Sequence, residues 1–317
     1  MHLSPDLSIA GALVGFLIGL TGMGGGALMT PILIMFFGVA PLAAVSSDLV
    51  ASLVMKPVGA AVHWRRGTVH RKLAAWLIAS SAPAAFGGVL VVRALGLDGE
   101  KQRLIKMLLG VVLLLTVASM IVRAWLTRRA EFAGRPQASG LQGPGELRVR
   151  PVATSLIGIV GGLAVGMTSV GSGTLVIALL LLAYPQLRAG QLVGTDLFQA
   201  IPLVGAAALG HALFGDVKLS ITASLLIGAL PAVYLGARLS ARRSNQWVRP
   251  IITVVLLASA LKLIGASTPL TLGLSAAWAT GQLLVPLAPR IVRRFVIARE
   301  LRRARQEVPE GAPLQSR

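Results

Sequence analysis

Two glycine-rich runs are the strongest candidates for ligand binding in this sequence. Each interrupts an apolar stretch and carries hydroxyl side chains beside its glycines. The residues concerned are Thr21, Gly22, Gly24, Gly25 and Gly26 in the first run, and Thr168, Ser169, Gly171, Ser172, Gly173 and Thr174 in the second. Glycine permits a sharp turn and close approach of a ligand to the backbone, and a helix that starts there presents N–H groups and its positive dipole end. This chemistry favours an anion. The alternative is that small residues only allow helices to pack closely, which is our interpretation of Gly11, Gly15 and Gly19.

Two aspartates form a second candidate group. Asp48 follows Ser47 and Asp196 follows Thr195, each near the start of a predicted helix. A carboxylate inside a spanning segment is costly and is by default a hypothesis of function. Either aspartate could accept a coupling proton. Alternatively, both lie close enough to the membrane surface to be hydrated, or they cap the broken stretches.

Lys56 is the only Lys or Arg well inside a predicted span, two helical turns beyond Asp48 on the same face. It could bind the anion directly or pair with Asp48 or Asp196, and pairing is favoured because an unpaired charge there is costly. If Lys56 pairs with Asp48, Asp196 is freer to take a proton. His63 and His211 end equivalent helices at opposite membrane faces, where a structural role is favoured over a proton relay.

The composition is that of an integral membrane protein. Of 317 residues, 55% are hydrophobic and 13% are charged, and most uncharged runs reach the roughly 17–25 residues that a spanning helix needs. The net charge of +19 comes from basic residues at the ends of apolar runs and in the C-terminal tail, which favours lipid headgroups over nucleic acid. The absence of cysteine excludes disulfides and thiolate chemistry. We find no nucleotide-binding loop, metal-ligand cluster or nucleophile–base pair, so we expect no metal, no cofactor and no enzyme.

The chain also contains an internal repeat. The first glycine-rich run matches the second at a separation of 147 residues, and one inserted residue makes the separation 148 further along. The matched pairs include Gly15 and Gly162, Thr21 and Thr168, Asp48 and Asp196, His63 and His211, and Pro83 and Pro231. Paired Asp, His and Pro in one register indicate a duplication.

Each half begins with a long glycine-broken apolar stretch, 7–37 and 151–184. As one helix, 7–37 would measure about 46 Å against a hydrocarbon core of roughly 30 Å, so it must bend. If both stretches are re-entrant hairpins, the four basic stretches of the chain fall on one side, as the positive-inside rule favours. We therefore predict an all-α polytopic membrane protein of two inverted-topology repeats, each a glycine-broken, re-entrant helix pair plus three transmembrane helices, with one extra C-terminal helix.

The predicted organisation has five parts. They are a first membrane repeat at 1–126, a cytoplasmic linker at 127–150, a second membrane repeat at 151–265, an extra transmembrane helix at 266–289 and a basic cytoplasmic tail at 290–317. The spans are expected at 42–64, 72–95, 104–126, 189–213, 218–240, 248–265 and 269–289.

An ordered set of motifs covers nearly the whole repeat, residues 8–265. It consists of Gly15-Phe16-x-x-Gly19-Leu20-x-Gly22-x-Gly24-Gly25-Gly26 followed by Pro31, then His63-Trp64-Arg65-Arg66-Gly67-Thr68-Val69, and the degenerate second copy. This set resembles the sulfite exporter TauE/SafE family of bacterial membrane permeases. The resemblance implies export of small sulfur-containing or organic anions, such as sulfite or sulfonates. Asp48 and Asp196 depart from the family pattern, in which an uncharged polar residue is more usual.

The favoured function is a secondary transporter that exports such anions, coupled to protons, in the bacterial inner membrane with a cytoplasmic C-terminal tail. The alternatives are an anion channel or a non-catalytic membrane subunit of a larger complex. We expect a small anionic substrate and membrane lipid as partners, no nucleic acid, and an oligomeric state that the sequence leaves open, a homodimer included. The tips of the two hairpins should face each other across one anion site, and Gly25→Val should block it.

Overall fold

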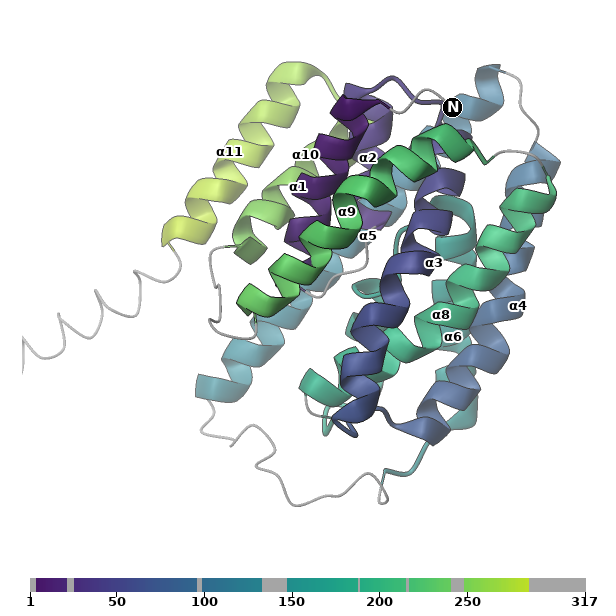
Figure 1. Ribbon diagram of the computed structural model, residues 1–317. Coiled ribbons are helices and arrows are strands. Elements are labelled where there is room, and N and C mark those ends of the chain that lie inside the picture. Colours follow the sequence, from purple (N-terminus) through teal and green to yellow (C-terminus); the bar gives the residue numbers. More distant parts are fainter. Residues whose placement is uncertain are drawn as a thin grey trace, which may run out of the picture.

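The fold is all-α, as predicted. The computed structural model describes residues 4–21, 26–95, 99–132, 147–187, 189–214, 217–240 and 248–284, and these contain eleven helices and no strand (Figure 1). In chain order the helices are α1 (Pro5–Thr21), α2 (Gly26–Phe36), α3 (Pro41–Arg65), α4 (Arg71–Leu95), α5 (Gly99–Phe132), α6 (Pro151–Thr168), α7 (Leu175–Ala183), α8 (Ala189–Leu213), α9 (Leu219–Ser240), α10 (Val248–Leu263) and α11 (Thr268–Leu284).

Six helices of the described chain are long and apolar enough to cross a membrane, namely α3, α4, α5, α6, α8 and α9. Five of them coincide with predicted crossings. The sixth, α6, was assigned to a hairpin, and α10, which was assigned a crossing, falls among the shorter apolar helices with α1 and α2. The described part of α11, which was predicted to be the extra transmembrane helix, falls in neither group. Length and composition therefore support a multi-pass membrane protein without deciding which helices cross.

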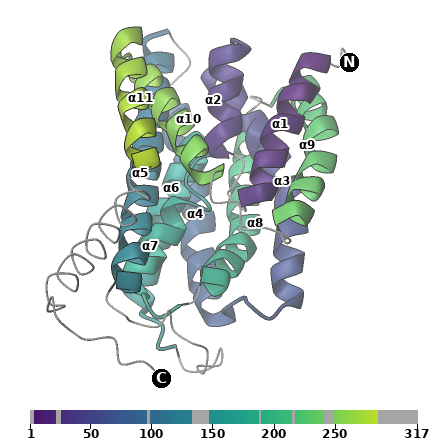
Figure 2. The same cartoon turned by 90° about the vertical axis from the view of Figure 1, so that its left-hand side faces the viewer.

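Both long apolar stretches are broken into a pair of helices, namely α1 and α2 (the first hairpin) and α6 and α7 (the second hairpin). In the first, α1 ends at Thr21 and α2 begins at Gly26; in the second, α6 ends at Thr168 and α7 begins at Leu175. The helices α1 and α2 lie towards the end of the molecule that carries the N-terminus, whereas α7 lies towards the opposite end (Figure 2). This arrangement is compatible with hairpins that enter from opposite sides, which stays a prediction.

Helices of the two repeats pack as exchanged pairs. α1 lies along α9, α4 lies along α6, and α3 packs against α8 (Figure 1). The repeat relates α1 to α6 and α4 to α9, so the first two pairings are counterparts of each other. A Cβ on Gly15 would lie 2.7 Å from the Ala229 carbonyl oxygen, and one on Gly162 would lie 2.3 Å from the Ser81 carbonyl oxygen. Glycine is therefore needed at both crossing points, and the predicted packing role of Gly15 is confirmed.

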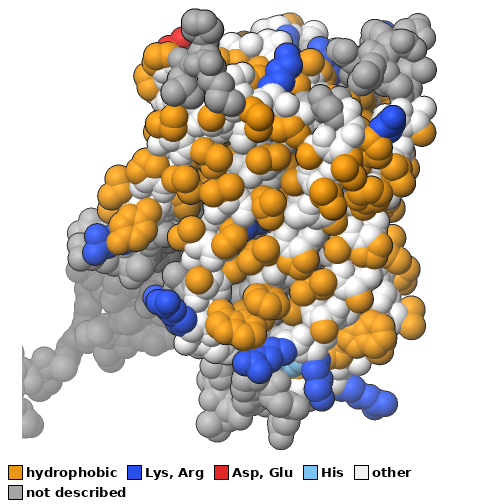
Figure 3. All heavy atoms as spheres, turned by 45° about the vertical axis from the view of Figure 1, so that its right-hand side comes forward, with side chains coloured by type: hydrophobic (Ala, Val, Ile, Leu, Met, Phe, Trp, Pro, Cys, Tyr) orange, Lys and Arg blue, Asp and Glu red, His pale blue; other side chains and the backbone are white. Residues whose placement is uncertain are grey.

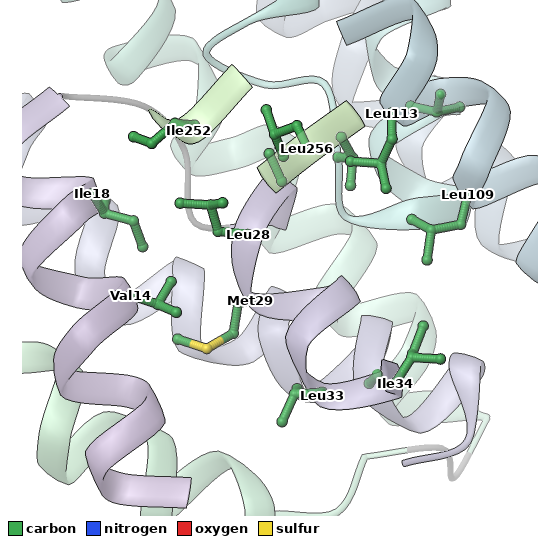
Figure 4. Packing of buried hydrophobic residues seen from close by; sticks show 14 of the residues in the cluster. Val14, Ile18, Leu28, Met29, Leu33, Ile34, Leu109, Leu113, Ile252 and Leu256 are labelled. Atoms are coloured by element: carbon green, nitrogen blue, oxygen red, sulfur yellow. The ribbon is translucent and has the colours of Figure 1, made fainter. Parts of the chain in front are cut away.

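An apolar cluster surrounds α2. Its Leu28 and Met29 pack with Val14 of α1, and the cluster continues through Leu113 of α5 and Leu256 of α10 (Figure 4). Because this short helix is enclosed on several sides, its first residue, at the end of the glycine run, is held inside the protein.

The surface has the pattern of a protein in lipid. Apolar side chains cover the middle of the face seen in Figure 3, and Lys and Arg gather towards its two ends. The exposed apolar residues include Leu115 at 51% and Ile227 at 56%, which would be costly in water. At one basic end the Arg71 guanidinium lies 4.8 Å from the centroid of the Trp64 ring, as is common at membrane interfaces.

Of the predicted non-membrane segments, the linker is partly described and the tail is not described. The helix α5 continues to Phe132, past the predicted linker boundary at 127, because the sequence after Trp125 is made mostly of good helix formers. The rest of the predicted linker up to 146, and the whole predicted tail at 290–317, lie outside the described residues.

Candidate functional site

The second hairpin turns through a buried segment at Ser169–Thr174. Ser169 ends α6 with φ 60°, and it is the only non-glycine residue with a positive φ in the described chain. Gly171 and Gly173 have φ values of 120° and 94°, where a side chain would be strained. The Gly171 carbonyl accepts the N–H of Leu175 at 3.1 Å, so α7 starts inside the protein with its N-terminus at the break.

The hydroxyl groups of this segment differ in their roles. Thr168 donates to the Ala164 carbonyl at 2.6 Å and accepts the Val170 N–H at 3.2 Å, so it fixes the end of α6. The Thr174 hydroxyl is buried and has no hydrogen-bond partner among the described residues. Thr174 is therefore the hydroxyl of this run that remains available to a ligand.

The first hairpin is described only from Gly26 onwards at its tip. Gly22, Gly24 and Gly25 lie outside the described residues, as does the side chain of Thr21. A Cβ on Gly26 would lie 1.8 Å from the carbonyl oxygen of Ser169. The start of α2 and the end of α6 are thus in direct contact, and only glycine fits at position 26.

Asp48 connects α3 to both hairpins. Its carboxylate is fully buried, and its Oδ2 accepts hydrogen bonds from the Thr30 hydroxyl at 3.0 Å and from the Ser169 hydroxyl at 2.7 Å. Its Oδ1 has no hydrogen-bond partner among the described residues. The Ser52 hydroxyl, one turn further along α3, is also buried and makes no hydrogen bond with a described group.

Lys56 reaches the same break from the next part of α3. Its ammonium group donates a hydrogen bond to the Ser172 hydroxyl and lies within electrostatic range of both Asp196 and Asp48. Pairing of Lys56 with one of these carboxylates stays a prediction. The direct hydrogen-bond partner is a hydroxyl of the second glycine-rich run.

Asp196 accepts a hydrogen bond from a side chain of its own helix, α8. Its Oδ1 accepts the Gln199 amide at 3.0 Å, and the Gln199 carbonyl oxygen accepts the Ser81 hydroxyl at 3.1 Å. All three side chains are buried. The two aspartates occupy matching positions in the repeat but have different hydrogen-bond partners.

The two histidines lie in different surroundings. His63 is half-buried, with Nδ1 at 3.0 Å from the Thr68 hydroxyl. His211 is fully buried, with Nδ1 at 2.9 Å from the Ser46 hydroxyl and Nε2 at 3.0 Å from the Gly166 carbonyl. His211 therefore joins α8, α3 and α6 in the interior, although its place at a helix end suggested the membrane surface.

Sequence reasoning missed three contributors, Thr30, Gln199 and Ser81. Gln199 had a detectable signal, because it is an uncharged polar residue one turn after Asp196 in an apolar run. Thr30 and Ser81 gave no such signal in the sequence, since isolated hydroxyl side chains are common in apolar helices, where they usually bond to a backbone carbonyl of the same helix.

Within the described part of the chain, the candidate site contains one ammonium group and two carboxylates, all buried, beside the N-termini of α2 and α7. Among the described residues no group of His, Asp or Glu side chains could hold a metal ion. An anion can be bound by hydroxyl groups, an ammonium group and helix N-termini, because all of them present hydrogen-bond donors or positive charge. The carboxylates can exchange protons.

Comparison with known proteins decides the family. The model of the sulfite exporter TauE/SafE family matches residues 7–263. The chain belongs to this family. Among relatives, this TauE/SafE member is 39% identical over 263 residues to the probable membrane transporter protein YjnA of Bacillus subtilis (strain 168), which covers 83% of the chain and 100% of the relative. It is 23% identical over 227 residues to the probable membrane transporter protein YdhB of the same organism. This match covers 71% of the chain and 86% of the relative. No solved structure matches the chain.

Proposed function

We propose that this TauE/SafE protein is a secondary transporter that exports small sulfur-containing or organic anions, of the sulfite or sulfonate kind, coupled to protons. Membership of a family of membrane transporters supports transport and argues against catalysis. The substrate class follows the description of the family. The residues proposed to bind the anion and the proton are those gathered around the two hairpin tips.

The contact of Lys56 with Ser172 is the main observation that supports an anion site. The ammonium group lies at the break where α7 begins and where the unpartnered hydroxyl of Thr174 is also buried. An anion bound there would meet a positive charge, a hydroxyl donor and a helix N-terminus together. Each of these is stabilising for a sulfite or sulfonate group, and the low polarity of the surroundings strengthens them.

Two nearby carboxylates support proton coupling. Asp48 and Asp196 both act on Lys56, so with all three groups ionised the site carries one net negative charge. An added anion would then be repelled in a medium of low dielectric constant. Protonation of a carboxylate removes that repulsion, and by reciprocity a bound anion favours the proton.

The membrane arrangement is proposed from charge and packing. The basic stretches following α3 and α5 would face the cytoplasm of a bacterium, with the C-terminal tail on the same side, in the inner membrane. The exchanged pairs α1 with α9 and α4 with α6 support two repeats of inverted topology. Each hairpin would then enter from its own side and bring its tip to the middle of the membrane.

A binding screen with the purified protein tests the anion site. Sulfite, sulfate, thiosulfate and a sulfonate are titrated against the wild type, Lys56→Met and Lys262→Met. Lys262 is an exposed lysine that bonds to Thr268 and serves as the matched control. We expect at least one of these anions to bind to the wild type and to Lys262→Met but not to Lys56→Met. Equal binding by folded Lys56→Met would remove the basis for the site.

A further inference from the structure

The two aspartates differ in one respect that bears on coupling. Asp48 uses only Oδ2 for its two hydrogen bonds, and its buried Oδ1 has no partner among the described residues. Asp196 receives the Gln199 amide on Oδ1, and Gln199 is itself held by Ser81. A proton can therefore add to Asp48 without displacing a hydrogen bond seen in the structure.

Asp48 also links α3 by hydrogen bonds to two elements that are distant from each other in the sequence. Thr30 belongs to α2 of the first hairpin, and Ser169 is the residue at which the second hairpin turns. When the carboxylate is ionised, both hydroxyls donate to a charged oxygen, and such charge-assisted hydrogen bonds are about twice as strong as neutral ones. The charge on Asp48 thus holds both hairpins to α3.

We propose that Asp48, rather than Asp196, takes the coupling proton on Oδ1, and that this releases Ser169, the first residue of the second hairpin's turn, from α3. The proton comes from water and converts the carboxylate to a neutral carboxyl group. Oδ2 then accepts the Thr30 and Ser169 hydroxyls only as a neutral oxygen, so both bonds weaken. The proposal rests on the proposed function and assigns its coupling step to one residue.

The other charged groups near Asp48 have roles of their own. Lys56 on the same helix acts on the carboxylate electrostatically and remains bonded to Ser172. On α8, Asp196 is bound by Gln199, and His211 by Ser46 and Gly166. The sequences of α2, α6 and the segment 169–174 contain no Asp, Glu, His, Lys or Arg. The charged residues of α5 and α9, which also pack against α3, lie near the ends of those helices.

Hydrogen exchange of the backbone amides of 169–174 measures the release without any anion. The full-length protein is compared from about pH 8 to about pH 5, after correction for the intrinsic pH dependence of exchange. In the wild type we expect exchange to rise about tenfold as the pH falls, since hydrogen bonds to a charged group contribute enough for such a change. Asp48→Asn should exchange fast at both pH values, and Asp196→Asn and His211→Gln should keep the wild-type response.

Two further variants keep the test decisive. Asp6→Asn makes the same chemical change at an exposed carboxylate and should behave as wild type. If Asp48→Asn does not fold, Thr30→Val removes one of the two bonds and should raise exchange at the higher pH with a smaller response. The proposal is overturned if wild-type exchange does not depend on pH, or if the dependence disappears in Asp196→Asn or His211→Gln. Failure to bind any anion would count against the proposed function alone.

Discussion

The ammonium group of Lys56 on α3 donates a hydrogen bond to the Ser172 hydroxyl in the break of the second hairpin. The contact joins the first repeat to the second, and the repeat supplies only one such cation because the matching position holds Val204. Asp48 makes a parallel contact to Ser169 two turns earlier on the same helix. One helix of the first repeat therefore holds the turn of the second through a carboxylate and an ammonium group.

Ser172→Ala should weaken anion binding by about tenfold, because one hydrogen bond to a charged group is lost. Isothermal titration with the anion found in the screen measures the change. Ser119→Ala is the matched control, since among the described groups that hydroxyl bonds to the Thr116 carbonyl of its own helix and to no other residue. If both variants bind as the wild type does, Ser172 has no part in the site.

Gly26→Ala should destabilise the protein by about 1–3 kcal/mol or more, as overpacking at a rigid contact does. The added Cβ would meet the Ser169 backbone, which cannot move aside as a side chain can. Gly273→Ala is the control, because its Cβ would find open space on α11, and there alanine should be neutral or stabilising. Thermal unfolding in detergent compares the two, and equal Tm values would argue against contact between the hairpin tips.

Gln199→Leu should lower the free energy of unfolding by about 1–3 kcal/mol, because it leaves the Asp196 carboxylate and the Ser81 hydroxyl without their amide partner. Gln282→Leu on α11 makes the same change at a less buried site and should have little effect. The measurement is unfolding monitored by intrinsic fluorescence. A Gln199→Leu protein as stable as the wild type would show that Asp196 is held by other groups.

His211→Phe should destabilise the protein by a similar amount, about 1–3 kcal/mol, while the pH dependence of anion transport stays as in the wild type. The ring nitrogens contact Ser46 and the Gly166 carbonyl, and phenylalanine can replace neither contact. His63→Gln should change stability less, because His63 is half-buried. Loss of the pH dependence in a stable His211→Phe protein would instead indicate a proton relay.

The fold could be predicted because the lengths of the apolar runs, the glycine breaks and the positions of the charges can all be read locally from the sequence. The breaks at Gly26 and Ser169 and the positions of Asp48 and Asp196 follow from the repeat. What Asp48 binds could not be predicted, because Thr30 and Ser169 reach it only after helices distant in sequence have packed. The glycines of α1 predicted close packing, but not that the partner would be α9 of the other repeat.

The two largest differences between the sequence-based prediction and the structure have the same cause. His211 was expected at the membrane surface because it ends a helix, but α3 and α6 pack around that end and bury it. Lys56 was expected to pair with Asp48 or Asp196, yet its direct hydrogen-bond partner is the Ser172 hydroxyl of the other repeat. Spacing along one helix determines which residues share a face, and packing between helices determines what that face meets.

Counterflow in proteoliposomes tests most directly whether this TauE/SafE protein is a secondary transporter. Vesicles loaded with unlabelled anion are diluted into a trace of the labelled anion, and uptake of label is followed with time. A transporter that alternates between two states should accumulate label transiently above its outside concentration, in a saturable manner that is lost in Lys56→Met and kept in Lys262→Met. Uptake that never exceeds equilibrium and rises linearly with concentration would contradict the proposal and indicate an anion channel.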